Sequence, residues 1–249
     1  MRELRCCNQQ FNQLWAFFTL DNSTVIFGVK QIAATLNRII QERDIHAFFF
    51  HKLVEIRPDT KEAVYELSEE PTGCGIIDDK AHRLNLEVEG KAKVTIPFDM
   101  LHTAPPQSAP DFLKKSPLAV PDNPGGWVDV DKHTLQHKRY DNVYALGDNA
   151  ALPTAKTGAA VRKQAPTVVT NLLKQMQHPK MNGSASYNGY SSCPLVTSYS
   201  RMVLAEFDYD NNLTPSFPFD QSKERYSMWL LKKYGLPYMY WNMMLKGKA

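Results

Sequence analysis

Several features that would identify a class of protein directly are missing from this sequence. No run of about eighteen or more apolar residues occurs, so no segment is suited to cross a bilayer as a helix. The four cysteines form no CxxC pair and show no zinc spacing, so they support neither a metal site nor a disulfide-rich secreted scaffold, and a reduced interior is expected. A net charge of +3, without a basic run interleaved with aromatics, argues against nucleic-acid binding.

The composition is typical of a globular protein. The chain has 249 residues, of which 43% are hydrophobic and 22% are charged, enough for one large domain or two modest ones. Residues 1–21 carry Arg2 and Arg5 ahead of an apolar stretch at 14–20, but side-chain amides dilute this segment and no cleavage site of small residues stands out. We therefore predict neither a signal peptide nor a clear transit peptide there.

The region up to residue 104 alternates between helical and strand-like patterns, which indicates an α/β fold. Apolar residues recur at helical spacing from Val29 to Arg43 and predict an amphipathic helix. Ala47–Phe50 is typical of a buried strand, and residues 53–67, with a Pro58-Asp59 turn, predict a β-hairpin. A loop is expected at 68–83, and further strands at 84–88, 94–96 and 100–103.

A segment rich in proline and glycine follows at 104–126 and predicts a crossing between two α/β pieces. Trp127–Val130 then predicts a strand, with Thr134-Leu135 as its partner. A helix is expected after Thr157, and Pro166 inside it should kink or restart it. The buried face of that helix is expected to continue through four apolar residues, Val168, Val169, Leu172 and Leu173.

The stretch from Tyr140 to Val161 carries the pattern most suggestive of a ligand site. Val143–Leu146 is an apolar run that predicts a buried strand of a parallel sheet, and Gly147-Asp148 ends it with a carboxylate. Thr154 or Thr157 can cap the following helix, whose first residues carry almost no side chain and leave backbone N–H groups open to a ligand. Such a site suits sugar hydroxyls at Asp148 and phosphates or carbonyl oxygens at the helix. An ordinary strand, turn and capped helix would have the same pattern.

The last third of the chain differs in character. Residues 202–207 predict a strand, and Cys193 falls in a loop containing glycine and tyrosine, where either a reactive thiolate or a purely structural cysteine is possible. Aromatic residues, methionines and lysines are concentrated at 217–249. This composition fits an amphipathic segment lying on a membrane surface, and it fits equally a helical hairpin packed on the domain core.

Several segments together resemble one family, the mitochondrial-type sulfide:quinone oxidoreductases. These are Tyr140–Ala160, Ser192–Arg201, Ala205–Tyr209, Phe217–Arg225 and Tyr240–Met244, and the resemblance extends from about Asn22 to the end of the chain. It implies a flavoprotein with two dinucleotide-binding domains at the mitochondrial inner membrane. Such an enzyme oxidises sulfide at a cysteine pair beside FAD, passes the sulfur to an acceptor as sulfane sulfur, and reduces ubiquinone.

The resemblance also implies roles for individual residues. Gly147, Asp148 and Lys156 would lie at the FAD, Cys193 would be one of the two redox cysteines, and Lys232 would lie near the quinone. Residues 22–104 would be part of an NAD(P)-binding-like domain, and 105–188 the C-terminal half of the FAD-binding domain. Residues 189–249 would carry the redox cysteine and the contact with membrane and quinone, whereas 1–21 match nothing in the family.

The chain also departs from the family pattern. It contains no GxGxxG motif for the ADP half of FAD, and Cys6, Cys7 and Cys74 stand in no context that matches the first redox cysteine. The sequence therefore resembles the C-terminal portion of the enzyme, and we expect it to hold FAD weakly or not at all. The alternative is a catalytically incomplete remnant that acts as a non-enzymatic binding or membrane-associated protein. A related NADH:quinone flavoenzyme is disfavoured, because it has no need of Cys193 in this context.

Overall fold

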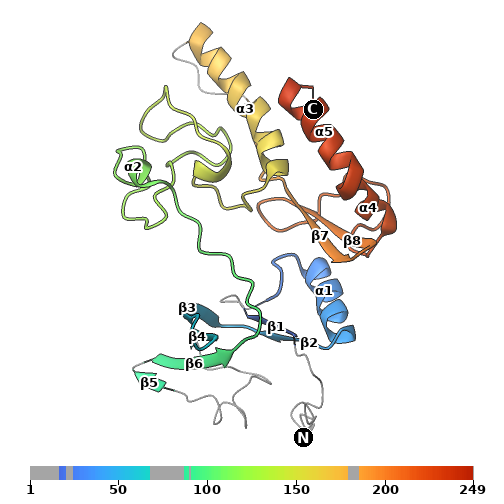
Figure 1. The fold of residues 1–249 in the computed structure, drawn as a ribbon. Coiled ribbons are helices and arrows are strands. Elements are labelled where there is room, and N and C mark those ends of the chain that lie inside the picture. The colour runs from blue at the N-terminus through green and yellow to red at the C-terminus, as the bar shows by residue number, and fades with distance from the viewer. Residues whose placement is uncertain (1–16, 21–24, 68–86, 90, 179–184, 249) are drawn as a thin grey trace, which may run out of the picture. The chain divides into compact units, whose positions relative to one another are not determined.

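The computed structural model describes residues 17–20, 25–67, 87–89, 91–178 and 185–248 (Figure 1). The chain divides into two compact units, Met1–Ala104 and Pro105–Ala249, so the boundary falls at the paired prolines. Both helices and sheets occur, in agreement with an α/β composition.

The first unit contains a parallel strand pair with a helix between its strands. Strand β1 (Phe17–Leu20) pairs with β2 (Ile45–Phe48), and α1 (Lys30–Glu42) connects them. The predicted amphipathic helix is confirmed, with Ile32 and Ile39 buried. The predicted strand at Ala47–Phe50 begins and ends two residues earlier, because Phe50 adopts a left-handed conformation with φ of 62° that an extended strand cannot contain.

An antiparallel sheet forms the rest of the first unit. Its strands are β3 (His51–Arg57), β4 (Glu62–Leu67), β5 (Glu87–Glu89) and β6 (Lys91–Pro97), in the order β3-β4-β6-β5. The predicted hairpin is confirmed as β3–β4, and one face of the sheet buries Ala63, Tyr65, Leu67, Val94 and Ile96. The strand predicted at 100–103 does not form. The predicted loop at 68–83, together with Leu84 and Leu86, lies outside the described residues.

The second unit begins with irregular structure in place of the predicted strands. After the short helix α2 (Asp111–Lys114), the backbone between 119 and 150 pairs only through isolated bridges, such as Val130 with His137 and Gln136 with Tyr144. The predicted strands at 127–130 and 143–146 are therefore wrong. Leu135 and Gly147 both have positive φ, 62° and 71°, and turn the chain before a ladder can extend.

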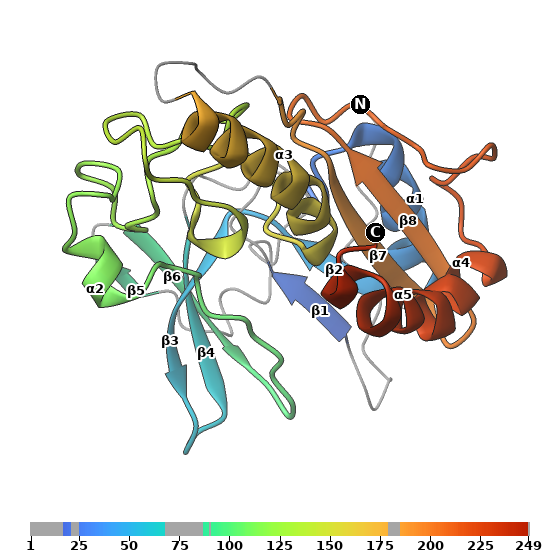
Figure 2. The same cartoon turned by 90° about the horizontal axis from the view of Figure 1, so that it is seen from above.

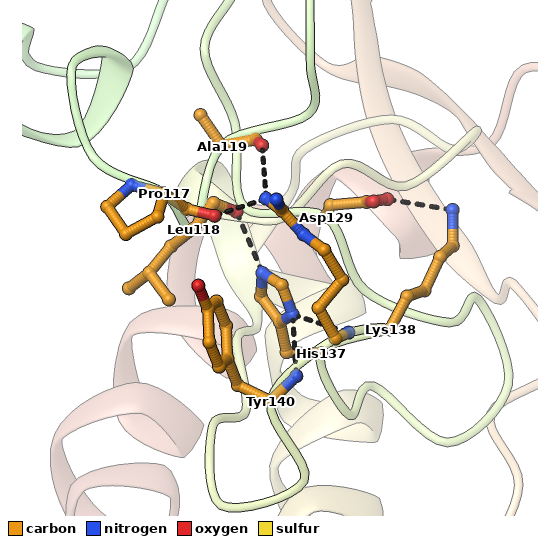
Figure 3. Close-up of polar contacts among 8 residues, drawn as sticks. Pro117, Leu118, Ala119, Asp129, His137, Lys138 and Tyr140 are labelled. Carbon is orange, nitrogen blue, oxygen red and sulfur yellow. Dashed lines mark hydrogen bonds and ion pairs between the residues drawn. The ribbon is translucent and has the colours of Figure 1, made fainter.

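Side chains replace the missing ladder in this segment (Figure 3). The buried His137 ring accepts hydrogen bonds at Nδ1 from the Arg139 and Tyr140 amides, at 2.9 and 3.2 Å. Nε2 therefore carries the proton and donates it to the Leu118 carbonyl at 3.1 Å. The Arg139 guanidinium adds a hydrogen bond to the Pro117 carbonyl. One histidine thus fixes two loops that are distant in sequence.

The long helix α3 (Gly158–Gln177) follows this segment. The Thr157 hydroxyl accepts a hydrogen bond from the Ala160 amide at 3.2 Å, so the predicted cap at Thr157 is confirmed. The Thr154 hydroxyl instead donates to the Gly189 carbonyl at 3.0 Å. Pro166 lies inside the helix, which continues through it without restarting.

The buried face of α3 differs from the predicted one, although Val168 does pack, partly buried, on a core cluster as predicted. The residues that face the core are Ala160, Gln164, Thr167 and Asn171, whereas Val169, Leu172 and Leu173 are 53%, 38% and 52% exposed. Hydrogen bonds explain this inversion, because Asn171 donates to the Thr134 and Ala185 carbonyls, each at 3.0 Å, and accepts from the Ala185 amide at 2.9 Å. These bonds hold the polar face inward.

A hairpin covered by C-terminal helices completes the second unit. Strands β7 (Ser191–Ser198) and β8 (Arg201–Phe207) are antiparallel, and β8 confirms the strand predicted at 202–207. The helical segments are α4 (Tyr226–Leu230), the π-helix η3 (Leu231–Gly235), α5 (Leu236–Asn242) and the short 3-10 turn η4 (Met244–Lys246). Met228 packs on Met202 and Leu204 of β8, and Figure 2 shows α4 and α5 beside the hairpin.

Candidate functional site

The turn at Gly147-Asp148 is the first part of the candidate site along the chain. It forms the 3-10 turn η2 (Gly147–Asn149), and the Gly147 amide donates to the Gln164 side-chain oxygen on α3 at 2.7 Å. A side chain at Gly147 would be strained because φ is 71°, and its Cβ would lie 3.2 Å from Val161. The turn is therefore pressed against the first turns of α3, while Asp148 is exposed to solvent.

Lys156 reaches back toward this turn. Its half-buried ammonium donates to the Ala150 carbonyl at 2.7 Å and lies 4.8 Å from the centre of the Trp127 ring. Burial lowers the pKa of Lys156, and the negative charge of Asp148 opposes that shift. Asp148 and Trp127 also line one shallow hollow, together with Pro105, Pro106, Gln107 and Ser108. The three residues expected at FAD, Gly147, Asp148 and Lys156, are thus brought together.

Hydrogen bonds join the segment that carries Lys156 to the strand that carries Cys193. The Thr157 and Ser191 hydroxyls lie 2.9 Å apart, and Ser191 also donates to the Ala155 carbonyl at 3.2 Å. Ser191 is completely buried at the start of β7. The sequence offered no signal for Ser191, because its partners precede it by more than thirty residues.

Cys193 lies within a strand and not in an exposed loop, so that prediction is wrong. It pairs with Ala205 across the hairpin and is a half-buried free thiol. Burial raises the pKa of this thiol, which favours its neutral form. Cys6, Cys7 and Cys74 lie outside the described residues.

Lys232 approaches the same strand from the C-terminal helices. It belongs to the π-helix η3, and its ammonium donates to the carbonyl of Pro194, the residue after Cys193, at 3.2 Å. Extra-residue turns of this kind inside α-helices are frequent at functional sites. The residue expected near the quinone therefore lies beside the strand of the expected redox cysteine.

A buried carboxylate holds the hairpin from its other face. Glu206, opposite Ser192, accepts hydrogen bonds from the Tyr190 hydroxyl, from the Ser216 amide at 2.9 Å and from the Gln221 side chain at 2.7 Å. Although burial raises the pKa of Glu206, these hydrogen bonds outweigh it and lower the pKa below its ordinary value. Glu206 and Trp127 were not predicted as site residues, because neither lies in a spacing pattern that marks a site.

Metal ligands do not gather anywhere in the part of the chain that the structure describes. No helix within the described ranges is long and apolar enough to cross a membrane. Exposed aromatic residues do gather on the C-terminal helices, where Tyr234, Tyr238 and Trp241 are 59%, 65% and 64% exposed.

No protein-family model matches the chain. The mitochondrial sulfide:quinone oxidoreductase of Mus musculus is 47% identical over 222 residues, which are 89% of this chain and 44% of that protein. The chain is homologous to part of this oxidoreductase. The resemblance drawn from the sequence motifs is therefore confirmed.

Two further relatives with the same name agree. The protein of Dictyostelium discoideum is 44% identical over 223 residues, and that of Schizosaccharomyces pombe is 33% identical over 229 residues. These alignments cover 90% and 89% of the chain. The chain spans 44% of the length of each of these oxidoreductases.

A solved structure shares the fold. It is a chain in the cryo-EM structure of the Tetrahymena thermophila mitochondrial ATP synthase, with a TM-score of 0.65 and 22% sequence identity. The match covers 93% of this chain and 49% of that one. This similarity concerns the fold alone.

Proposed function

We propose that this chain forms part of an FAD-dependent sulfide:quinone oxidoreductase of mitochondria. The observation that carries the proposal is that the residues expected at flavin, thiol and quinone converge within one unit, through the Thr157–Ser191 and Lys232–Pro194 hydrogen bonds. The name shared by the homologous oxidoreductases supports both the reaction and the mitochondrial location. We further propose that the enzyme is attached to the mitochondrial inner membrane.

The turn and the start of α3 suit the flavin and ribityl end of FAD. Asp148 offers a carboxylate that can accept hydrogen bonds from ribityl hydroxyls, and the Lys156 ammonium can donate to the flavin ring. A Cβ at the exposed Gly158 would meet no atom within 4 Å, so the first turn of α3 leaves room for a ligand. The flavin, when bound, supplies the capacity to accept two electrons from a thiol and to release them to a quinone.

Cys193 is proposed as one of the two redox cysteines. Sulfide would attack the disulfide of the pair, so that one sulfur becomes a persulfide and the other leaves as a thiolate. The sulfane sulfur then passes to an acceptor. Burial raises the pKa of Cys193, so the neutral thiol is favoured over the thiolate.

Lys232 and the exposed C-terminal aromatics are proposed to serve the quinone and the membrane. The ammonium of Lys232 can donate a hydrogen bond to a quinone carbonyl oxygen beside the Cys193 strand. Tyr238 and Trp241, together with Lys246 and Lys248, have the amphipathic chemistry that favours a membrane interface.

Sulfide-dependent reduction of ubiquinone tests the proposed reaction. We would join the chain to the part of the mouse oxidoreductase with which it does not align, and compare Cys193→Ser with Val196→Ser, an exposed position of the same strand. The first change should abolish turnover and the second should preserve it. Turnover that survives Cys193→Ser would remove this cysteine from the reaction.

The same hybrid enzyme tests the quinone assignment. Lys232→Met removes the proposed quinone contact together with the bond to the Pro194 carbonyl, and it should raise the KM for ubiquinone with little change in the KM for sulfide. Lys233→Met is the matched control, because the Lys233 ammonium lies over the Trp229 ring, 4.9 Å from its centre, and has no proposed contact with quinone. Equal effects of the two changes would contradict the assignment.

Flotation with liposomes containing anionic lipid tests the membrane surface. Replacing Tyr238 and Trp241 by serine should reduce the floated fraction of the chain. Tyr199→Ser is the control, since Tyr199 is 98% exposed in the β7–β8 turn and lies outside the C-terminal helices. Undiminished flotation of the double variant would contradict membrane contact through these helices.

A further inference from the structure

The Trp127 indole lies against both a glycine turn and the Lys156 ammonium. A Cβ at Gly125 would lie only 2.1 Å from Cζ3 of the indole, so glycine is required there for the ring to keep its place. On the other side, the Lys156 ammonium lies 4.8 Å from the ring centre, within the range of a cation–π interaction. The backbone around Gly125 thus makes room for the ring that receives the lysine.

Packing and hydrogen bonds hold the indole still. Trp127 packs on an apolar cluster that comprises Ala109, Leu113, Val128, Val130, Ala145 and Ala150. Its carbonyl accepts a hydrogen bond from the Val120 amide at 2.9 Å, and the Gly125 carbonyl accepts one from the Ala109 amide at 2.8 Å. A ring fixed in this way can orient a flexible neighbour.

Lys156 needs such orientation, because a lysine side chain has four rotatable bonds and loses considerable entropy when it is fixed. The Ala150 carbonyl accepts one hydrogen bond from its ammonium at 2.7 Å, and Asp148 supplies the nearby negative charge. Ala150 belongs to the cluster on which Trp127 packs. One small core therefore places both the acceptor and the ring that confine the ammonium.

We propose that Trp127 is a positioning residue of the candidate flavin site: its ring holds the Lys156 ammonium beside the hollow that Trp127 and Asp148 line. This inference rests on the proposed function, since the positioned ammonium is the group that would meet the flavin ring. Trp127 itself acts through Lys156 and takes no part in the reaction. Trp127 positions the ammonium through its aromatic face, so phenylalanine at this position should keep part of the effect.

The contact can be tested on the full chain without cofactor. Reductive methylation with ¹³C-formaldehyde labels the lysines, and an aromatic ring shifts the methyl resonance of an ammonium held over its face upfield. The Lys156 resonance, assigned with Lys156→Arg, should be shifted upfield in the wild-type chain. Trp127→Leu should abolish this shift, and Trp127→Phe should keep part of it.

Two further variants guard against general effects of substitution. Gly125→Ala changes no aromatic residue of the sequence, but its Cβ forces the Trp127 indole to move. It should therefore also reduce the upfield shift of the Lys156 resonance. Trp229→Leu removes a second Trp–Lys pair, in which the Lys233 ammonium lies 4.9 Å from the ring centre, and should move only the Lys233 resonance. A Lys156 resonance that does not change in Trp127→Leu would overturn the inference.

The consequence for ligand binding is measured by titration with FMN, which carries the flavin ring and the ribityl chain. Trp127→Leu should weaken FMN binding about two- to fivefold, as expected for the loss of one cation–π contact, and Trp127→Phe should restore part of it. Equal affinity of wild type and Trp127→Leu would overturn the positioning role even if the contact exists. Wild-type chain that does not bind FMN even at millimolar concentration would instead contradict the flavin site of the proposed function, and the inference with it.

Discussion

The two units of the molecule hold their backbones in different ways. The first unit uses strand ladders closed over an apolar cluster, with Val94 completely buried at its centre. The second unit, which contains the candidate site, relies on buried polar side chains that bond to distant backbone, such as His137, Asn171 and Glu206. Among the described residues, every polar side chain classed as buried lies in the second unit, except that of His51.

This difference follows from how each unit satisfies its backbone N–H and C=O groups. A ladder satisfies its own backbone groups, so apolar residues suffice for its stability. A site assembled from turns leaves backbone groups without ladder partners, and side chains must satisfy them. The second unit should therefore tolerate the loss of polar contacts poorly, and the first should tolerate it well.

The largest effect is expected from Glu206→Leu. The change leaves the Tyr190 hydroxyl, the Ser216 amide and the Gln221 amide without their acceptor in a buried place, which should cost about 3–5 kcal/mol of unfolding free energy. Glu55→Leu in the first unit is the control, because its ion pair with Arg57 is exposed to solvent and should contribute little to stability. Denaturant unfolding measures the loss of unfolding free energy in each variant. Similar losses in Glu206→Leu and Glu55→Leu would contradict the difference between the two units.

The next largest effect is expected from His137→Phe. Phenylalanine is more hydrophobic, yet it leaves two backbone amides unpaired and removes one of the two hydrogen bonds to the Leu118 carbonyl, which keeps only the bond from the Asp129 amide. Destabilisation of about 2–4 kcal/mol should follow. Hydrogen exchange of the Arg139 and Tyr140 amides should accelerate while the first unit is unaffected. Val94→Ala should accelerate exchange in the first unit instead, and a neutral His137→Phe would show that side-chain bonds do not hold this segment.

The pH dependence of stability should carry the signature of the Tyr190–Glu206 pair. Hydrogen bonds lower the pKa of Glu206, so its contribution is complete above the ordinary glutamate pKa of about 4.3 and is lost as pH falls below it. Burial and Glu206 raise the pKa of Tyr190 to about 12, so its contribution is complete below about pH 10 and is lost as pH rises toward 12.

Thermal unfolding at a series of pH values measures both limbs. Tyr190→Phe should reduce the alkaline loss of stability, to which burial of Tyr209 and Tyr187 also contributes by raising the pKa of each. Glu206→Gln should reduce the acidic loss. Profiles that do not differ from wild type at either end would contradict the assignment of these shifts.

The smallest effect is expected on the exposed face of α3. Leu173→Gln should change the unfolding free energy by no more than about 0.5 kcal/mol, because Leu173 is 52% exposed. Asn171→Leu, two residues away, should cost about 2–4 kcal/mol, since it removes three hydrogen bonds from a completely buried amide. If Leu173→Gln lowers the unfolding free energy more than Asn171→Leu does, the buried face predicted from the sequence would be the right one.

Sequence patterns predicted the first unit better than the second, and the reason is physical. Periodicity reports local burial, so it predicted α1 and the β3–β4 hairpin, and the Thr157 cap is likewise a local interaction. The strand predicted at Val143–Leu146 is wrong because positive φ angles and distant side chains decide that segment. The buried face of α3 was predicted from its apolar residues and differs for a similar reason, since the hydrogen bonds of Asn171 fix which face points inward.

The candidate site was predicted in part. Gly147, Asp148, Lys156, Cys193 and Lys232 were chosen by resemblance. Homology to the oxidoreductases supports the motifs that contain the first four, whereas Lys232 lies between two of the motifs. Their roles stay predictions. Trp127, Ser191 and Glu206 were missed, because each contributes through contacts to residues distant in sequence, which no local pattern encodes.

Alkylation of Cys193 with and without FAD tests the central claim, that the flavin residues and this thiol form one site. The rate is followed by mass spectrometry at about pH 9, where a thiol of raised pKa begins to react. Millimolar FAD should slow alkylation of Cys193 in the wild-type chain, because the Thr157–Ser191 bond brings the flavin residues to its strand, and Asp148→Ala should weaken this protection. Equal rates with and without FAD, or full protection in Asp148→Ala, would contradict it.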